Sequence, residues 1–284
     1  MNFRKPASCV TSIAFRGMAG DAACPRLRSL IRSAAAISLL MLTIASGAAA
    51  QSAGPTIPLS DADRGQLDAL LGAGVVGEAL PSAPLGNPAS YLPRLGKTLT
   101  YQVVTQGKKP AIEIHEIAET TDAAFKPGWH YTVGNAGEMY IQKDPAGRAL
   151  TSAEKDLDTK VLSRFIPGDP LILTGLQPGQ SVSSSHKVEV YDLSNLTQIS
   201  HSGSLDITYS HLGTFRVTVP AGTFDAALVK WSYSGKIGPA NIKDSQYRFF
   251  APNVGMVAMI QIRSISALLV YNDHTKRGKL LARQ

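Results

Sequence analysis

The chain has 284 residues, with 28 Lys and Arg, 21 Asp and Glu and a formal net charge of +7. The positive excess lies before residue 51, because 22 basic and 20 acidic residues follow Ala50. A near-neutral remainder removes the main support for a nucleic-acid partner. Both cysteines, Cys9 and Cys24, also precede residue 51, so the remainder can form neither a disulfide nor a Cys-ligated metal site.

Residues 1–50 have the pattern of a cleaved signal peptide. Three arginines precede a largely apolar stretch, residues 34–50, which is shorter than the about 20 residues that a membrane-spanning helix needs. Ala48 and Ala50 have the A-x-A spacing of a signal-peptidase site, and Met18 offers an alternative start of more ordinary signal length. The pattern predicts a periplasmic or secreted protein with no transmembrane segment after cleavage.

Residues 51–96 are predicted to form one short helix and a proline-rich linker. Ser60 can cap a helix whose first turn carries Asp61 and Asp63, both favourable at the positive end of the helix dipole. Three leucines between residues 67 and 71 follow at the spacing of one helix face. Four prolines then interrupt the last sixteen residues of this region.

Residues 97–284 are predicted to form an all-β domain. Short runs of alternating apolar and polar residues are separated by Gly, Pro and Asn turns, which is typical of antiparallel strands. We expect a curved sheet, a sandwich or a partly open barrel, preceded by the one short helix. The candidate strands are residues 98–104, 111–118, 129–133, 138–142, 181–192, 197–210, 214–219, 224–234, 243–251, 255–263 and 265–272.

Two segments of this domain are not predicted as strands. Residues 152–165 have helix-like spacing at three apolar positions, and we expect a short helix or a loop. Residues 272–284 concentrate Lys and Arg. A solvated, frayed terminus is the expected form of this tail, and contact with anionic headgroups or an acidic partner is the alternative.

Two strand–turn–strand corners are the most informative motif. The first, within residues 215–231, contains V-P-A-G-T-F-D, in which Pro220 fixes φ and Gly222 supplies a conformation that other residues rarely adopt. The second, within residues 247–257, places an aromatic–Ala–Pro–x–x–Gly corner between two apolar strands. Backbone geometry alone explains both sets of turn residues, so the corners are interpreted as structural.

With these corners, the chain resembles bacterial exported proteins of unknown function that carry the V-P-A-G-T-F-D turn. The resemblance covers residues 215–260 well and extends weakly to residues 95–101, where such proteins often have an aromatic residue and this chain has Leu99. The resemblance implies an antiparallel fold of the curved-sheet, lipoprotein-carrier type. It implies no catalytic residue.

No catalytic or metal-binding motif is found. The six histidines include no pair at i, i+2 or i, i+4, and Glu119 stands where a zinc-protease H-E-x-x-H would need its second histidine. A metal site built from His201, His211 and a distant carboxylate stays open as an alternative. The sequence therefore predicts no catalytic residue, no metal ligand and no cofactor.

The sequence leaves three functions open. The first is a non-enzymatic envelope protein that holds a lipid, another apolar small molecule or an envelope partner against a concave sheet. The second is a periplasmic hydrolase or metal-dependent enzyme built from scattered His, Asp and Ser, and the third is a structural or assembly factor of the envelope. For the first, the candidate ligand-binding residues are Trp129, Tyr131, Trp231, Tyr233, Phe249 and Phe250.

Overall fold

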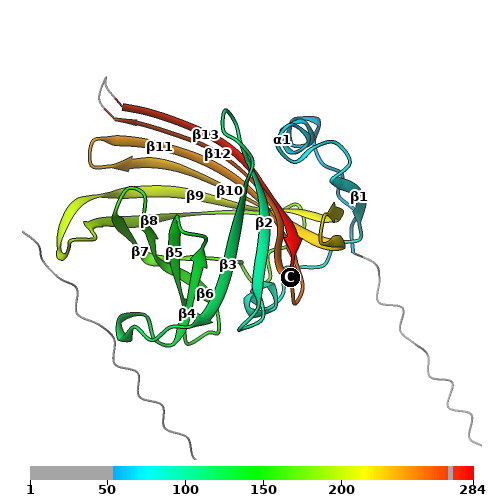
Figure 1. Cartoon of the computed structure of the whole chain (residues 1–284). Helices are drawn as coiled ribbons and strands as arrows, with labels where there is room; N and C mark the ends of the chain where they lie inside the picture. Colours follow the sequence, from blue (N-terminus) through cyan, green and yellow to red (C-terminus); the bar gives the residue numbers. More distant parts are fainter. Residues whose placement is uncertain (1–53, 268–270) are drawn as a thin grey trace, which may run out of the picture. The chain divides into compact units, whose positions relative to one another are not determined.

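The structure is a computed structural model that describes residues 54–267 and 271–284. The predicted signal peptide, residues 1–50, lies outside the described residues. One helix and two short 3-10 helices accompany thirteen strands in the described part of the chain (Figure 1). In chain order the elements are α1 (Asp61–Leu71), β1 (Val76–Leu80), η1 (Pro88–Tyr91), β2 (Thr98–Thr105), β3 (Ala111–Glu119), η2 (Ala123–Phe125), β4 (Gly128–Val133), β5 (Gly137–Lys143), β6 (Ala149–Asp156), β7 (Val161–Pro170), β8 (Ser181–Asp192), β9 (Asn195–Val219), β10 (Gly222–Ile237), β11 (Ala240–Ala251), β12 (Gly255–Ala267) and β13 (Tyr271–Arg283).

The sheet closes on itself because β9 is long enough to pair with two neighbours. Neighbouring strands pair antiparallel from β2 through to β13, and β13 returns to pair with β2. Residues 203–210 of β9 bond to β8 on one side and to β10 on the other. The result is a closed barrel of twelve strands, to which β1 adds along the last part of β9. The all-β, antiparallel prediction is confirmed.

Side chains alternate between the inside of the barrel and the opposite face of the sheet, part of which α1 covers. Along β11, Phe250 belongs to an apolar cluster inside the barrel together with Trp129 and Trp231. Its neighbour Phe249 belongs to a second cluster, with Leu67 of α1. This period of two is the ordinary consequence of the strand pleat.

The predicted helix forms as the sequence indicates. The Ser60 hydroxyl accepts a hydrogen bond from the backbone N–H of Asp63 at 3.1 Å and so caps the helix. The Asp63 carboxylate in turn accepts hydrogen bonds from Lys230 Nζ at 2.9 Å and from the Tyr247 hydroxyl at 2.6 Å. These contacts fix the start of α1 on the sheet, and Leu67 is buried beneath it.

Both corners are tight turns between long strands. Pro220 and Ala221 form the turn between β9 and β10, and Gly222 has a φ of 134°. In the second corner, Asn253 occupies the left-handed region with a φ of 61°, which asparagine tolerates better than most residues. The structural interpretation of the corner residues therefore agrees with their backbone geometry.

Residues 152–165 do not form a helix or a loop, so that prediction was wrong. They belong to the hairpin of β6 and β7. The side chain of Asp156 accepts hydrogen bonds from the backbone N–H groups of Asp158 and Thr159, and this turn reverses the chain where a helix would have continued.

The basic tail is not frayed either. Residues 272–283 lie in β13 between β12 and β2, so the tail is a central part of the barrel wall. The predicted strand 265–272 is divided between the end of β12 and the start of β13. The predicted strands 197–210 and 214–219 are joined in β9, which passes through Gly213 with a register shift in its pairing to β10.

The proline-rich segment before β2 packs against the barrel. Leu85 and Leu92 are buried in the inner apolar cluster, and Tyr91 packs edge-on against Phe250 with ring centroids 6.2 Å apart. The backbone N–H of Asn253 donates to the carbonyl of Ser90 at 2.6 Å. This segment covers one end of the barrel.

Within residues 54–267 and 271–284, no helix has both the length and the apolar character that crossing a bilayer would require.

The substitution Leu67→Ala tests the packing of α1 on the barrel. Leu67 is fully buried, so its truncation leaves a cavity and should lower the free energy of unfolding by about 2–5 kcal/mol. Urea denaturation followed by circular dichroism measures this loss. Ile112→Ala is the matched control, because Ile112 is 62% exposed on β3, and a cost as large as that of Leu67→Ala would contradict the proposed packing.

Candidate functional site

The barrel encloses a cavity of about 370 Å³. It extends from the turns after β2, β4 and β6, where Lys108, Ala136 and Asp158 line it, to a floor formed by Leu92 and Phe250. The floor is closed by the proline-rich segment described above. A volume of this size lies in the lower part of the range for small-molecule sites.

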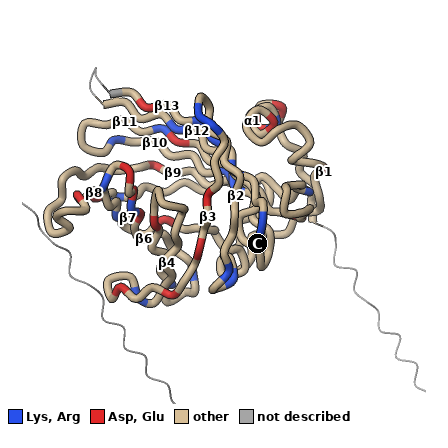
Figure 2. Tube along the Cα trace, viewed as in Figure 1, with Lys and Arg blue, Asp and Glu red and all other residues tan. Residues whose placement is uncertain are grey.

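The cavity wall combines an apolar part with a charged part. The inner cluster and the proline-rich segment supply the apolar part near the floor. Figure 2 shows basic positions on the β11–β13 side of the barrel and acidic positions on β3 and around β6. The apolar side chains are Met139, Ile141, Leu171, Phe250, Met256 and Met259, and the charged side chains discussed below are Glu154, Asp156, Arg248, Arg263, Arg277 and Lys279.

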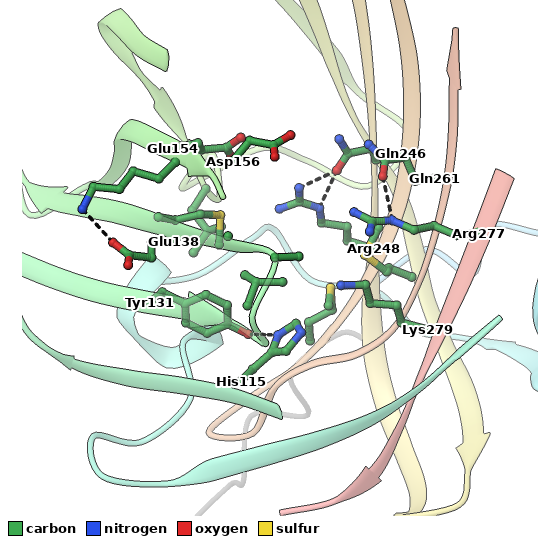
Figure 3. Close-up of a pocket in the computed structure, with 18 of the residues that line it drawn as sticks. His115, Tyr131, Glu138, Glu154, Asp156, Gln246, Arg248, Gln261, Arg277 and Lys279 are labelled. Atoms are coloured by element: carbon green, nitrogen blue, oxygen red, sulfur yellow. Dashed lines mark hydrogen bonds and ion pairs between the residues drawn. The ribbon is translucent and has the colours of Figure 1, made fainter. Parts of the chain in front are cut away.

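The basic wall follows from strand register. Arg277 and Lys279 are two positions apart on β13, so both side chains point into the cavity. Arg277 is paired with Gln261 of the neighbouring strand β12. Gln261 is paired in turn with Gln246 of β11, whose neighbour on the same face is Arg248. Three adjacent strands therefore place two glutamines and three cations on one patch of the inner wall (Figure 3).

A single carboxylate orients both glutamines. Asp244 accepts hydrogen bonds from Gln246 Nε2 at 2.7 Å and from Gln261 Nε2 at 2.8 Å. Each amide oxygen is thereby directed to an arginine: Arg248 Nε donates to Gln246 Oε1 at 3.0 Å, and Arg277 Nε donates to Gln261 Oε1 at 2.9 Å. The arrangement holds both guanidinium groups in place through neutral amides.

Lys279 differs from the two arginines because it has a carboxylate partner. Its Nζ donates to Glu113 Oε2, which also lies 3.0 Å from His115 Nε2. His115 Nδ1 lies 2.7 Å from the Tyr131 hydroxyl, so a continuous hydrogen-bonded chain runs across β13, β3 and β4. Burial raises the pKa of Glu113, but the hydrogen bond to His115 and the charge of Lys279 outweigh it and bring that pKa down to about 2.

The cations on this wall are crowded in a poorly hydrated space. Burial, followed by the positive charge of Arg277, lowers the pKa of Lys279 to about 8. Burial also lowers the pKa of Arg277, and its attraction to Glu113 only partly offsets this. Burial is the main cause of both lowered pKa values, and repulsion between the neighbouring cations adds to it.

Acidic groups occupy the opposite side of the interior. Glu154 of β6 lines the cavity, and its enclosure by the barrel raises the pKa of its carboxyl, while the charge of Arg248 acts against this rise. Asp169 of β7 is buried outside the cavity lining and accepts a hydrogen bond from the Tyr233 hydroxyl at 3.0 Å. Burial raises the pKa of Asp169 to about 7.

The structure brings together five of the six aromatic residues predicted to bind ligand. Trp129, Tyr131, Trp231, Tyr233 and Phe250 all belong to the cluster inside the barrel, where Tyr131 and Phe250 line the cavity itself. Trp231 lies beneath Arg248, whose guanidinium carbon is 3.8 Å from the centroid of the indole ring. Phe249 does not join them, because it faces the cluster beneath α1.

Sequence reasoning missed the charged wall. The signal that could have revealed it is the alternation of charged residues within apolar strands, such as Glu113 and His115 in β3 or Arg277 and Lys279 in β13. For residues 272–284, the sequence predicts a solvated terminus instead. Ile112 and Ile114, which alternate with Glu113 and His115, are instead the exposed side chains of β3.

The histidines do not gather at one place. His115, His186 and His211 are buried at separate positions in the barrel, and His201 is exposed on β9. Within the described part of the chain, no group of three His, Asp or Glu side chains has the geometry to hold a metal ion.

Comparison with known proteins gives one family and three solved structures. The sequence profile of a family described as DUF3108-like matches residues 153–261, from within β6 to within β12. This match includes both corners and Arg248, but it ends before Arg277 and Lys279. Among curated proteins, none matches the sequence.

The three structures resemble the chain only distantly. A protein of Bacteroides fragilis, described as exported and as having a YmcC-like fold, is 17% identical with a TM-score of 0.39, and the alignment covers 68% of this chain and 97% of that one. A lipoprotein of Parabacteroides distasonis is 15% identical with a TM-score of 0.34 over 68% and 97% of the two chains. The lipoprotein YmcC of Escherichia coli is 8% identical with a TM-score of 0.32 over 67% and 90%. At these scores, neither fold nor function is carried over to this chain.

The substitution Asp169→Asn tests the buried carboxyl through pH. An acid whose pKa is raised on folding stabilises the fold fully below its unfolded pKa, near 4, and loses that contribution as the pH rises to about 7. Asparagine can still accept the bond from Tyr233 and does not ionise. Between pH 4 and pH 8, the wild type should therefore lose up to roughly 4 kcal/mol relative to the variant.

Urea unfolding at pH 4, 6 and 8 measures this difference. Asp206→Asn is the control, since Asp206 is an exposed acid on β9. Parallel pH curves for the wild type and Asp169→Asn would show that the carboxyl ionises normally in the folded protein.

Proposed function

We propose that this protein is a non-enzymatic envelope protein that binds a small, largely apolar molecule inside its barrel. The observation that carries the proposal is the 370 Å³ cavity, which has an apolar floor and reaches the turns at the other end of the barrel. Apolar pockets with a few convergent polar groups are the usual form of small-molecule sites.

The composition of the apolar wall supports a flexible ligand. Met139, Met256 and Met259 contribute three unbranched, polarisable side chains, which adapt to ligands of irregular shape. Phe250 and Leu92 give the floor a rigid apolar surface. A chain-like or ring-like apolar group fits such a wall better than a polar metabolite, whose hydrogen-bonding groups would be left unpaired at the floor.

Export is the second part of the proposal. It is supported by the basic, apolar and small-residue pattern that ends at Ala50. A barrel built without cysteine after that point can fold in an oxidising or a reducing compartment, so the proposal does not depend on which side of an outer membrane the protein reaches.

The hydrolase alternative has weaker support. His115 is the histidine that lines the cavity, and both of its ring nitrogens lie within hydrogen-bond distance of protein partners, Tyr131 and Glu113. A general base needs a nitrogen that faces the substrate. An alternative role for the fold as an assembly factor is compatible with the exposed Ile112 and Ile114 on β3, but nothing about these two side chains selects a partner.

Decanol, an uncharged ten-carbon chain, is a suitable probe of the cavity. We expect saturable one-to-one binding in a calorimetric titration of the protein. Met139→Trp should weaken this binding by about tenfold or more, because the indole ring fills space that the ligand needs.

Val104→Trp is the matched control, since Val104 is a half-exposed residue on β2 that does not line the cavity. Both variants should keep the circular dichroism spectrum of the wild type. Absence of decanol binding to the wild type, or equal weakening by the two substitutions, would contradict a binding site inside the barrel.

A further inference from the structure

Two of the three guanidinium groups that line the cavity, those of Arg248 and Arg277, have no acidic partner of their own. Among the residues that the structure describes, no carboxylate lies within 4.0 Å of Arg248 or Arg277. Their Nε atoms are bonded to the neutral amides of Gln246 and Gln261. A neutral partner positions a guanidinium but does not compensate its charge.

This lack of a direct ion pair is unusual for cations inside a protein. Buried or enclosed charges are normally paired, because the interior solvates them poorly. The other cations on the same wall follow this rule: Lys279 is bonded to Glu113, and Arg263 Nη2 lies 2.8 Å from Asp273 Oδ2. The exception therefore concerns the two arginines that the Asp244 network holds in place.

Arginine has five N–H donors in a planar fork that matches an oxyanion. The Arg277 Nε–H donates to Gln261, and Arg248 uses its Nε–H and one Nη2–H on Gln246, so the other donors of both groups remain available to a ligand. Trp231 covers one face of the Arg248 guanidinium and further restricts its orientation. Figure 3 shows both side chains directed into the cavity, with Glu154 and Asp156 across from them.

We propose that the ligand is an amphiphilic carboxylic acid, whose carboxylate binds between Arg248 and Arg277 and whose apolar chain extends toward Phe250 and Leu92. The inference rests on the proposed function, because it identifies the class of molecule that occupies the same cavity. A head group with a single negative charge fits better than one with two, because the carboxylates of Glu154 and Asp156 line the cavity across from the arginines and would repel the additional charge.

Three ten-carbon probes distinguish the head groups: decanoate, decanol and decylammonium. If the arginines form the head-group site, the wild type should bind decanoate at least about tenfold more tightly than decanol, because charge-assisted hydrogen bonds are about twice as strong as neutral ones. Decylammonium should bind more weakly than decanol.

The substitution Gln261→Glu is the sharpest test of the mechanism. It keeps the shape of the side chain but gives Arg277 a carboxylate partner, and it removes the hydrogen bond that Gln261 donates to Asp244. Decanoate affinity should therefore fall about tenfold or more, while decanol affinity stays within about twofold. Arg277→Gln should have the same selective effect. Arg283→Gln, an exposed change on the same strand, should leave both affinities unchanged.

The outcomes separate the two proposals. Equal binding of decanoate and decanol by the wild type would overturn the head-group inference and leave the cavity proposal in place, as would preferential binding of decylammonium. Binding of none of the three probes would overturn both. Decanol binding also verifies that each variant retains its barrel, so a loss of decanoate alone cannot be attributed to unfolding.

Discussion

Closure of the sheet through β9 is the constraint on which the rest of the structure depends. Residues 203–210 have strand partners on both sides, and this double pairing converts a long antiparallel sheet into a ring. A barrel of eight strands has an interior that side chains just fill, and the diameter grows with the number of strands. Twelve strands therefore enclose more space than their own inward side chains occupy.

Three groups of residues occupy this interior. Aromatic residues from opposite walls form the inner cluster, the proline-rich segment before β2 closes one end, and charged and amide side chains surround the remaining space. The polar part is costly to enclose, and most of it is arranged so that each group has a partner. Arg248 and Arg277 depart from that arrangement, and they do so beside the cavity rather than in the packed region.

The sequence predicts the fold class, the helix and most strands because these depend on local patterns. The Ser60 cap, the alternation along β2 and the turn residues Pro220 and Gly222 are each set by neighbours within a few positions. Closure is not predictable in this way. It depends on how far β9 extends past its first partner, which is a property of pairing between distant segments.

The candidate site is harder to predict for the same reason. Arg248, Gln261 and Arg277 are spread over about thirty residues and meet only because three successive strands align them in one row. Considered without its strand partners, the β13 segment is rich in Lys and Arg, and this composition is typical of a solvated terminus. Phe249 and Phe250 show the opposite problem: adjacent aromatic residues were assigned together, although the strand pleat must separate adjacent side chains.

The position of β13 has a consequence for how the chain reaches its folded state. This strand lies between β12, its predecessor, and β2, which was made roughly 170 residues earlier. Until β13 has been synthesised and has paired, the facing edges of β12 and β2 have unpaired backbone groups, and such edges readily pair with other chains. A newly made molecule therefore passes through an open stage that is prone to association, and only the insertion of β13 removes its free edges.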